Sequence, residues 1–240
     1  MACHFARWVT TESEPNTERL PAEVLTFANT LLPKLRTRFI HGRVLLAELM
    51  FYLYGTTKLP QVVTLPSGRP CFASSGLPDF SLAYAGNTIG VMLSSEGKVG
   101  LDLEILHART PLHQARQSAL SAVEKTWITM QSDPNEAALQ LECIRQSVHK
   151  ISGLSDIASD SLSLNPTSGR LRSSITANLQ VLSDIEGAEI WSCAHAPAVQ
   201  RMICWHYTPD ENFLRGRTFS AQQQVDSLHF MKFTSLPPAK

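Results

Sequence analysis

Apolar residues recur at the 3.6-residue period of an amphipathic helix in two long segments of the chain. The first segment, residues 34–54, is followed by Gly55, which is placed to end a helix. The second starts with Asp-Pro-Asn-Glu at residues 133–136, where the aspartate can cap the helix, proline suits its first position and the glutamate completes a capping box. It extends to about Ile151, and Gly153 lies beyond its end. We therefore predict two long helices.

Shorter β-rich runs fill much of the remaining sequence. Residues 4–9 predict a short edge strand, and a group of three runs follows the first helix. These runs, residues 80–84, 88–94 and 98–105, are separated by Gly86-Asn87 and Glu96-Gly97. Because such dipeptides favour hairpin turns, they predict an antiparallel meander. Later strands are expected around residues 160–164, 189–194 and 201–207.

The order of these elements, helix and then strands in each half, predicts an α+β fold built from two similar lobes. We place the N-terminal lobe at residues 1–106 and the C-terminal lobe at residues 107–208. Residues 209–240 form a polar C-terminal extension, much of which we expect to be loosely ordered.

Composition excludes several classes of protein. Lys and Arg number 21, Asp and Glu number 21, and 43% of the 240 residues are apolar. This argues against a disordered chain and removes the non-specific attraction of a basic protein to nucleic acid or anionic lipid. Five scattered cysteines without a CxxC pair indicate reduced thiols. The most apolar stretch, residues 44–54, is far short of a membrane span, and no signal-peptide core is found. We expect a cytoplasmic protein that binds neither nucleic acid nor membranes.

A pair of carboxylates in the segment Gly-Leu-Asp-Leu-Glu-Ile, residues 100–105, is the first candidate for chemistry. Residues two apart in a strand face the same side, so Asp102 and Glu104 share one face while Leu101 and Leu103 point to the core. Two carboxylates at this spacing suit a hard cation such as Mg²⁺, completed by a substrate phosphate. The alternative is an exposed strand face with two solvated acids.

Two further segments carry cations. Gly-Arg-Pro at residues 68–70 forms a turn that bears an arginine, a side chain suited to bidentate phosphate contact, just before a strand. On the second long helix Gln146 and Lys150 are four residues apart and share a face, next to Arg145. Taken alone, each segment is more simply an ordinary turn or a solvated helix face.

Together these segments resemble the 4′-phosphopantetheinyl transferases of the surfactin-synthetase-activating type. That family shows GKP, F-N-L-S-H-S, G-[IV]-D-[IVL]-E and W-x-x-K-E-x-x-x-K, in this order and at similar separations. The corresponding segments here are residues 68–70, 80–85, 100–104 and 142–150, preceded by an R-x-L-L element at 43–46. The resemblance covers roughly residues 38–153; the G-x-D-x-E segment matches well and the others are degenerate.

The resemblance implies two pseudo-twofold related lobes with coenzyme A bound between them and Mg²⁺ on its diphosphate. The acceptor would be a serine of an apo acyl carrier protein or peptidyl carrier protein, as in fatty acid or polyketide biosynthesis. The implied catalytic residues are Asp102, Glu104, Gln146 and Lys150, of which the first three hold the metal. The implied coenzyme A ligands are Arg43, Arg69, Pro70, Tyr84 and Lys150. Two lobes in one chain need no partner copy, so we expect a monomer.

The chain departs from the family pattern at three places. Ala83-Tyr84 replaces the Ser-His that grips the 3′-phosphate, and a tyrosine hydroxyl brings no positive charge. Gln146 replaces a glutamate commonly assigned as metal ligand or general base, and an amide cannot accept a proton at neutral pH. Glu142 replaces an aromatic residue; about 5–6 Å before Gln146 on the same helix face, it could supply the missing acid. Water and Asp102 are the other candidate bases.

Two other functions stay open. A catalytically degenerate family member would bind coenzyme A or a carrier protein without transfer, and an unrelated metal-carboxylate enzyme could share the G-x-D-x-E segment. Coenzyme A binding that depends on Mg²⁺ excludes the second, and transfer excludes the first. The histidines, including His107, His113 and His149, lack metal-ligand spacing, and the cysteines lack a paired His-Asp arrangement, so we interpret both as structural.

Overall fold

The computed structural model describes residues 2–10, 15–106, 120–153, 161–220 and 227–235. Its helices are α1 (Ala22–Asn29), α2 (Pro33–Tyr54), α4 (Ala122–Thr129) and α5 (Pro134–Ser152). The strands of the first half are β1 (Ala2–Val9), β2 (Val62–Thr64), β3 (Pro70–Phe72), β4 (Asp79–Ala85), β5 (Thr88–Ser94) and β6 (Lys98–Ile105). Those of the second half are β7 (Leu162–Asn165), β8 (Arg170–Ser173), β9 (Gln180–Glu186), β10 (Glu189–Ala196), β11 (Arg201–Thr208), β12 (Asn212–Ser220) and β13 (Met231–Ser235).

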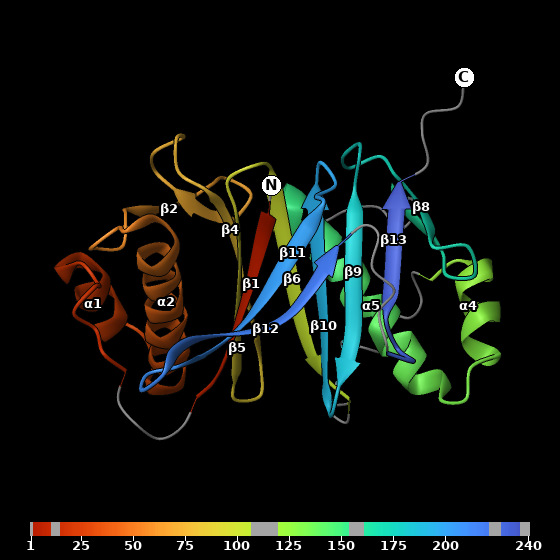
Figure 1. Ribbon diagram of the computed structural model, residues 1–240, viewed down its shortest axis with the longest axis horizontal. Helices are drawn as coiled ribbons and strands as arrows, with labels where there is room; N and C mark the ends of the chain where they lie inside the picture. Colours follow the sequence, from red (N-terminus) through yellow and green to blue (C-terminus); the bar gives the residue numbers. More distant parts are fainter. Residues whose placement is uncertain (1, 11–14, 107–119, 154–160, 221–226, 236–240) are drawn as a thin grey trace.

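These elements form four layers, with two sheets between two pairs of helices (Figure 1). One sheet has the strand order β12-β11-β1-β5-β4 and the other has β6-β10-β9-β13-β8-β7. Helices α1 and α2 pack on the first sheet around Trp8, and α4 and α5 pack on the second around Ile144 and Phe233. A third core lies between the sheets, where the ring centroids of Phe5 and Trp191 are 5.5 Å apart. The predicted α+β class is confirmed.

The chain contains the same arrangement twice. In the first unit, β1 is followed by a short helix, a long helix and two hairpins, and β5 returns to pair antiparallel with β1. In the second unit, β6 is followed by the same elements, and β10 returns to pair antiparallel with β6. Both long helices end at a left-handed glycine, Gly55 at φ 69° and Gly153 at φ 70°. The repeat places β6 at the head of the second unit, whereas the predicted lobe boundary at residue 106 lies after it; that boundary stays a prediction.

The two units meet where β4 and β6 lie side by side without a backbone ladder, a line that we call the seam. The amide of Val99 on β6 donates to Asp79 Oδ2 at 2.9 Å, and the amide of Leu101 donates to Ser81 Oγ at 3.0 Å. Side chains of β4 therefore satisfy backbone groups that a neighbouring strand would otherwise bind. Helix α2 approaches the seam from the β4 side and α5 from the β6 side.

Both predicted long helices are confirmed, as α2 and α5. Asp133 caps α5 by accepting from the amides of Asn135 and Glu136 at 2.9 and 3.1 Å. The two short helices were not predicted, although Ser121 and Glu124 form a complete capping box at the start of α4. No helix in the described ranges is long and apolar enough to cross a bilayer.

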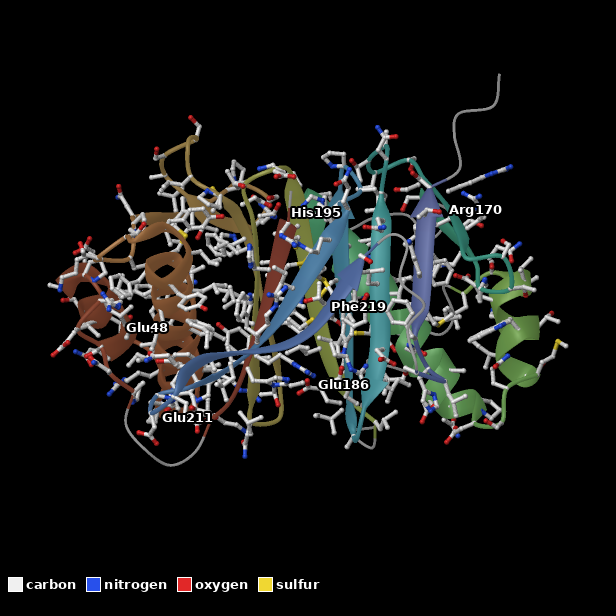
Figure 2. The ribbon with its side chains drawn as sticks, in the orientation of Figure 1. Glu48, Arg170, Glu186, His195, Glu211 and Phe219 are labelled. Atoms are coloured by element: carbon white, nitrogen blue, oxygen red, sulfur yellow. The ribbon has the colours of Figure 1, made fainter. Side chains whose placement is uncertain are left out.

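Two predicted strand pairings are wrong. β1 is not an edge strand, because β5 binds it on one side and β11 binds it, in parallel, on the other. The Gly86-Asn87 turn does join β4 to β5, but after Glu96-Gly97 the chain leaves the meander and β6 pairs with β10 in the other sheet. At this crossing His195 of β10 bridges the sheets, with Nε2 2.7 Å from Ser94 Oγ (Figure 2). Local turn signals hold no information on such distant pairing.

The C-terminal segment is also more regular than predicted. β12 extends the first sheet beside β11, and β13 inserts between β9 and β8 of the second. Phe219 of β12, labelled in Figure 2, packs on Trp191 with ring centroids 5.5 Å apart, and Phe233 of β13 is 1% exposed. Few apolar side chains are enough to attach each strand, because its backbone is also bound, that of β12 by β11 and that of β13 by β9 and β8.

The buried position of Phe233 gives a direct test of this correction. Phe233→Ala removes a ring from the core under α5, so we expect the free energy of unfolding to fall by about 3–5 kcal/mol. Leu228→Ala is the matched control, because Leu228 is 100% exposed and its loss should change stability by less than about 0.5 kcal/mol. Urea unfolding followed by tryptophan fluorescence measures both. Equal, small effects would show that β13 adds nothing to the core.

Candidate active site at the seam

Asp102 and Glu104 lie on the face of β6 that is turned to α5, as the alternation along the strand predicts, while the leucines beside them enter the core between the sheets. Gly100 permits the close approach of the helix, because a Cβ atom there would lie 1.9 Å from the backbone oxygen of Ser147. The glycine of the motif therefore sets the distance between the two carboxylates and α5.

Lys150 of α5 binds one of these carboxylates. Its Nζ donates to Asp102 Oδ1 at 2.7 Å, and the carboxylate is buried while the ammonium group is partly exposed. The second oxygen, Asp102 Oδ2, is buried and has no hydrogen-bond partner among the described residues. A buried carboxylate oxygen without a donor is unfavourable, so this atom is suited to a cation that approaches from the seam.

Cys143 lies on α5 within electrostatic reach of the same groups. Burial raises the pKa of its thiol well above the ordinary value, and the charges of Asp102 and Glu104 raise it further, while Lys150 acts in the opposite direction. The thiol is therefore protonated at neutral pH. The four residues together define one small region between β6 and α5.

A pocket of about 330 Å³ opens beside this region, between the β2–β3 turn, the start of β4 and the C-terminal half of α5. This volume lies within the range of small-molecule sites. Four of the predicted site residues line it, namely Arg69, Pro70, Gln146 and Lys150. Asp102 is not part of the lining but is held against it by Lys150.

Sequence reasoning missed His149, which also lines the pocket. Residues 146, 149 and 150 share one face of α5, because residues three and four apart are neighbours on a helix. This periodicity around Gln146 and Lys150 is the signal that could have found the histidine. His107 and His113 lie outside the described residues.

Arg69 contacts three elements that meet at the seam, namely β4, β6 and α5. Its guanidinium forms a bidentate ion pair with Asp79 and also donates to the backbone oxygens of Val99 on β6, at 3.0 Å, and Lys150 on α5, at 2.9 Å. The side chain is buried, and its stem packs against Gly153, where a Cβ atom would lie 2.7 Å from Arg69 Cβ. Most of its donors are therefore engaged within the protein, although it lines the pocket.

Two charged residues of α5 near Gln146, Arg145 and Glu142, do not line the pocket. Arg145 Nη2 donates to Glu124 of α4 at 2.6 Å, and this ion pair is buried. The arginine therefore joins α5 to α4 and adds no free charge to the pocket, although it replaces a lysine of the family motif. Glu142 is also buried and lies outside the pocket lining.

Arg43 and Tyr84 lie apart from this pocket, where α2 meets β4. Gly42 makes room for the phenol, because a Cβ atom there would lie 2.2 Å from Tyr84 Oη. Burial raises the pKa of Tyr84 and lowers that of Arg43, and the charge of each group opposes the shift of the other. The structure thus places these two predicted ligands close to each other, with Tyr84 two strand residues, or roughly 7 Å, from Leu82 at the pocket.

The region between β6 and α5 offers few protein ligands for a metal ion. Among the described residues, no group of three His, Cys, Asp or Glu side chains is arranged to hold a metal ion. Mg²⁺ is usually held by only one or two carboxylates together with substrate phosphates. The unpartnered Oδ2 of Asp102, with Glu104 on the same strand face, meets that smaller requirement.

Comparison with known proteins finds a relative that matches over the whole chain. The uncharacterized protein YieE of Escherichia coli strain K12 is 37% identical over 246 residues, which cover 100% of this chain and 98% of YieE. The 4′-phosphopantetheinyl transferase AcpT of Salmonella typhimurium is 35% identical over 74 residues, and AcpT of Escherichia coli strain K12 is 34% identical over a segment of the same length. Those segments cover 31% of this chain and 35% of AcpT. No family model matches the chain.

The position of Arg69 predicts a large effect on stability. Arg69→Met removes the buried cation from the Asp79 carboxylate and leaves it only the exposed Lys98 and the Val99 amide as partners, so we expect a loss of about 3–5 kcal/mol in the free energy of unfolding. Lys98→Met is the matched control: Lys98 pairs with the same carboxylate but is 61% exposed, so its loss should cost at most about 1 kcal/mol. Chemical denaturation measures both values. Similar losses in the two variants would contradict the role of Arg69 as the buried connection.

Proposed function

This chain belongs to the family of the Escherichia coli protein YieE, and we propose that it is a Mg²⁺-dependent 4′-phosphopantetheinyl transferase that acts on an apo acyl carrier protein or peptidyl carrier protein. The observation that carries the proposal is the contact of Asp102, in the G-x-D-x-E segment, with Lys150 of α5 beside a ligand-sized pocket. The partial likeness to AcpT supports the same reaction class.

In the proposed reaction, the acceptor serine oxygen attacks the β-phosphorus of coenzyme A. A new phosphorus–oxygen bond forms to the serine, the bond to the bridging oxygen breaks, and adenosine 3′,5′-bisphosphate leaves. A base takes the serine proton. Such a transfer depends chiefly on positioning and on the neutralisation of phosphate charge.

Each predicted residue has a role in this proposal. Lys150 contributes positive charge at the diphosphate, and its bond to Asp102 fixes the ammonium group at the pocket wall. Asp102, Glu104 and the amide oxygen of Gln146 would hold Mg²⁺, which when bound supplies charge neutralisation on the diphosphate oxygens.

Coenzyme A would extend along the seam from the pocket at Arg69 and Pro70 toward Arg43 and Tyr84. Arg69 would contribute mainly by holding the pocket wall, because Asp79 and two carbonyls already engage its guanidinium. The two units of one chain supply both sides of the seam, so the proposed enzyme acts as a monomer.

A second function is favoured by the chemistry of the pocket wall. Gln146 stands where a carboxylate is expected, and Lys150 already occupies one oxygen of Asp102. A site with one acid fewer attracts a divalent cation less strongly, which favours a protein that binds coenzyme A or a carrier without transfer.

Intact-mass spectrometry separates these two functions. Apo carrier proteins incubated with this protein, coenzyme A and Mg²⁺ should gain one phosphopantetheinyl group, and Asp102→Ala should abolish the gain because it removes the unpartnered oxygen. Circular dichroism is the control that both proteins are folded, and calorimetry with coenzyme A measures binding by the wild type. Coenzyme A binding without any gain of mass across the carrier panel would assign the chain to the binding function instead.

The candidate base Glu142 gives a sharper prediction. If it takes the serine proton in place of residue 146, Glu142→Gln should lower the transfer rate at least about 100-fold, and the double variant Glu142→Gln with Gln146→Glu should restore it. Coenzyme A affinity should change little in either variant. A wild-type rate in the single variant would rule Glu142 out and leave water or Asp102.

A further inference from the structure

A second pocket, of about 420 Å³, lies between the two sheets, at the end of the strands opposite to the crossing from β5 to β6. This volume is within the range of small-molecule sites. The first sheet contributes the ends of β1 and β11 and the start of β5, and the second contributes the end of β6 and the β9–β10 hairpin. Figure 2 shows Glu186 of this hairpin at the end of the sheets away from His195. No residue lines both this pocket and the one at the seam, so the two are separate sites. We call this one the hairpin pocket.

One buried arginine in the wall of the hairpin pocket is shared by two carboxylates. Arg7 Nη2 lies 2.5 Å from Glu186 Oε2, and its Nη1 lies 3.0 Å from Glu189 Oε1. These three groups together carry one negative charge. Arg217 also approaches Glu186, at 3.5 Å, but its nearer partner is the buried carboxylate of Asp184, at 2.8 Å. The excess negative charge therefore stays at the hairpin, on the side of Glu189.

Two polar groups of the hairpin pocket have no partner in the part of the chain that the structure describes. Thr88 lines the pocket and is 7% exposed, yet its hydroxyl forms no hydrogen bond with another described residue. Glu189 engages Arg7 through Oε1, and no described residue donates to its Oε2. Polar groups buried to this extent are normally hydrogen-bonded. Their missing partners, in a cavity of ligand size, indicate a ligand that donates hydrogen bonds.

His206 does not offset the charge of the hairpin pocket that it lines. Burial and the positive charge of Arg7 lower the pKa of its imidazole, and the two hairpin carboxylates act in the opposite direction. The ring is therefore neutral at pH 7. Much of the remaining wall is apolar and comes from Val9, Ile105, Ala188 and Tyr207. The pocket thus combines hydrogen-bond acceptors and a negative charge with apolar walls.

We propose that the hairpin pocket binds a small organic amine, whose primary ammonium group donates to Glu189 Oε2 and Thr88 Oγ1 while its apolar body lies against Val9 and Ile105. An ammonium group has three donors and no acceptor, and it carries the positive charge that the carboxylates lack. An anionic ligand is disfavoured, because Arg7 is already engaged by two acids. An organic cation is favoured over a metal ion, because the described residues hold no group of three His, Cys, Asp or Glu side chains arranged for a metal. This site does not depend on the proposed transferase function.

NMR of the full chain tests the proposal directly. The probe is phenethylamine, which carries an ammonium group on an aromatic body, and phenethyl alcohol is its uncharged counterpart. Trp191 Nε1 donates to Glu186 Oε1 at 3.2 Å, so the indole N–H signal of Trp191, assigned with Trp191→Phe, reports on the hairpin. The amine should shift this signal to saturation. The alcohol should bind at least about tenfold more weakly, because hydrogen bonds to charged groups are roughly twice as strong as neutral ones. The indole of Trp127, on α4, should not move.

Two variants test the pocket itself. Glu189→Gln keeps the shape of the side chain but removes the excess charge, so it should raise the dissociation constant of the amine at least about tenfold and leave that of the alcohol nearly unchanged. Ala188→Phe adds a ring to the pocket wall from the exposed hairpin and should abolish binding of both probes. Glu23→Gln is the matched control. It changes the net charge equally but is exposed on α1, in the helical layer outside the first sheet (Figure 1), so both constants should stay at the wild-type values.

Each outcome decides the proposal. A saturable shift of the Trp191 signal that both pocket variants weaken and the control preserves supports the amine site. Equal affinities for the amine and the alcohol, unchanged by Glu189→Gln, would overturn the ammonium contact and leave an apolar cleft. No shift with the amine in the millimolar range would overturn the pocket as a binding site. If Glu189→Gln does not fold, Ala188→Phe decides alone, because undiminished amine binding in that variant would contradict the site.

Discussion

The ion pair between Arg69 and Asp79 is the contact on which the site depends. Arg69 comes from the β2–β3 turn, Asp79 begins β4, and the same guanidinium reaches backbone oxygens of Val99 on β6 and Lys150 on α5. Asp79 in turn accepts the amide of Val99. Two buried side chains thus connect four elements that converge on one pocket. Because the guanidinium is engaged by Asp79 and backbone oxygens, and the carboxylate by Arg69, Lys98 and a backbone amide, the elements are held at fixed distances.

The internal repeat allows the two units to be compared, and only the second unit carries the candidate catalytic residues between its first strand and its long helix. β1 and β6 begin equivalent units, and each turns one face to its long helix. In the first unit that face is aromatic: the rings of Trp8 and His41 are 4.8 Å apart in the core. In the second unit it bears Asp102 and Glu104 opposite Lys150. The same architecture therefore carries an aromatic core contact in the first unit and charged groups in the second. Both units border the seam.

Local sequence was sufficient for the parts of the structure that local forces decide. The apolar period and end signals placed α2 and α5, and the alternation along residues 100–105 placed both carboxylates on the face of α5. It was insufficient wherever distant segments meet. The central position of β1, the transfer of β6 to the second sheet and the insertion of β13 all depend on partners far away in the chain. Residue types predicted Arg69 as a phosphate ligand, but not that Asp79 would engage it.

The substitutions that separate this chain from the transferase pattern have a common electrostatic effect. Arg69 is neutralised by Asp79 and Arg145 by Glu124, so neither brings free positive charge to the pocket, where Lys150 binds Asp102. Gln146 is uncharged where the family pattern has a glutamate, so the pocket wall carries one acid fewer than that pattern. A divalent cation is attracted less by such a site than by one with three acids, so it would depend more on the phosphates that it shares. A substrate that brings its own diphosphate would supply that missing charge, which is consistent with the coenzyme A donor that we propose.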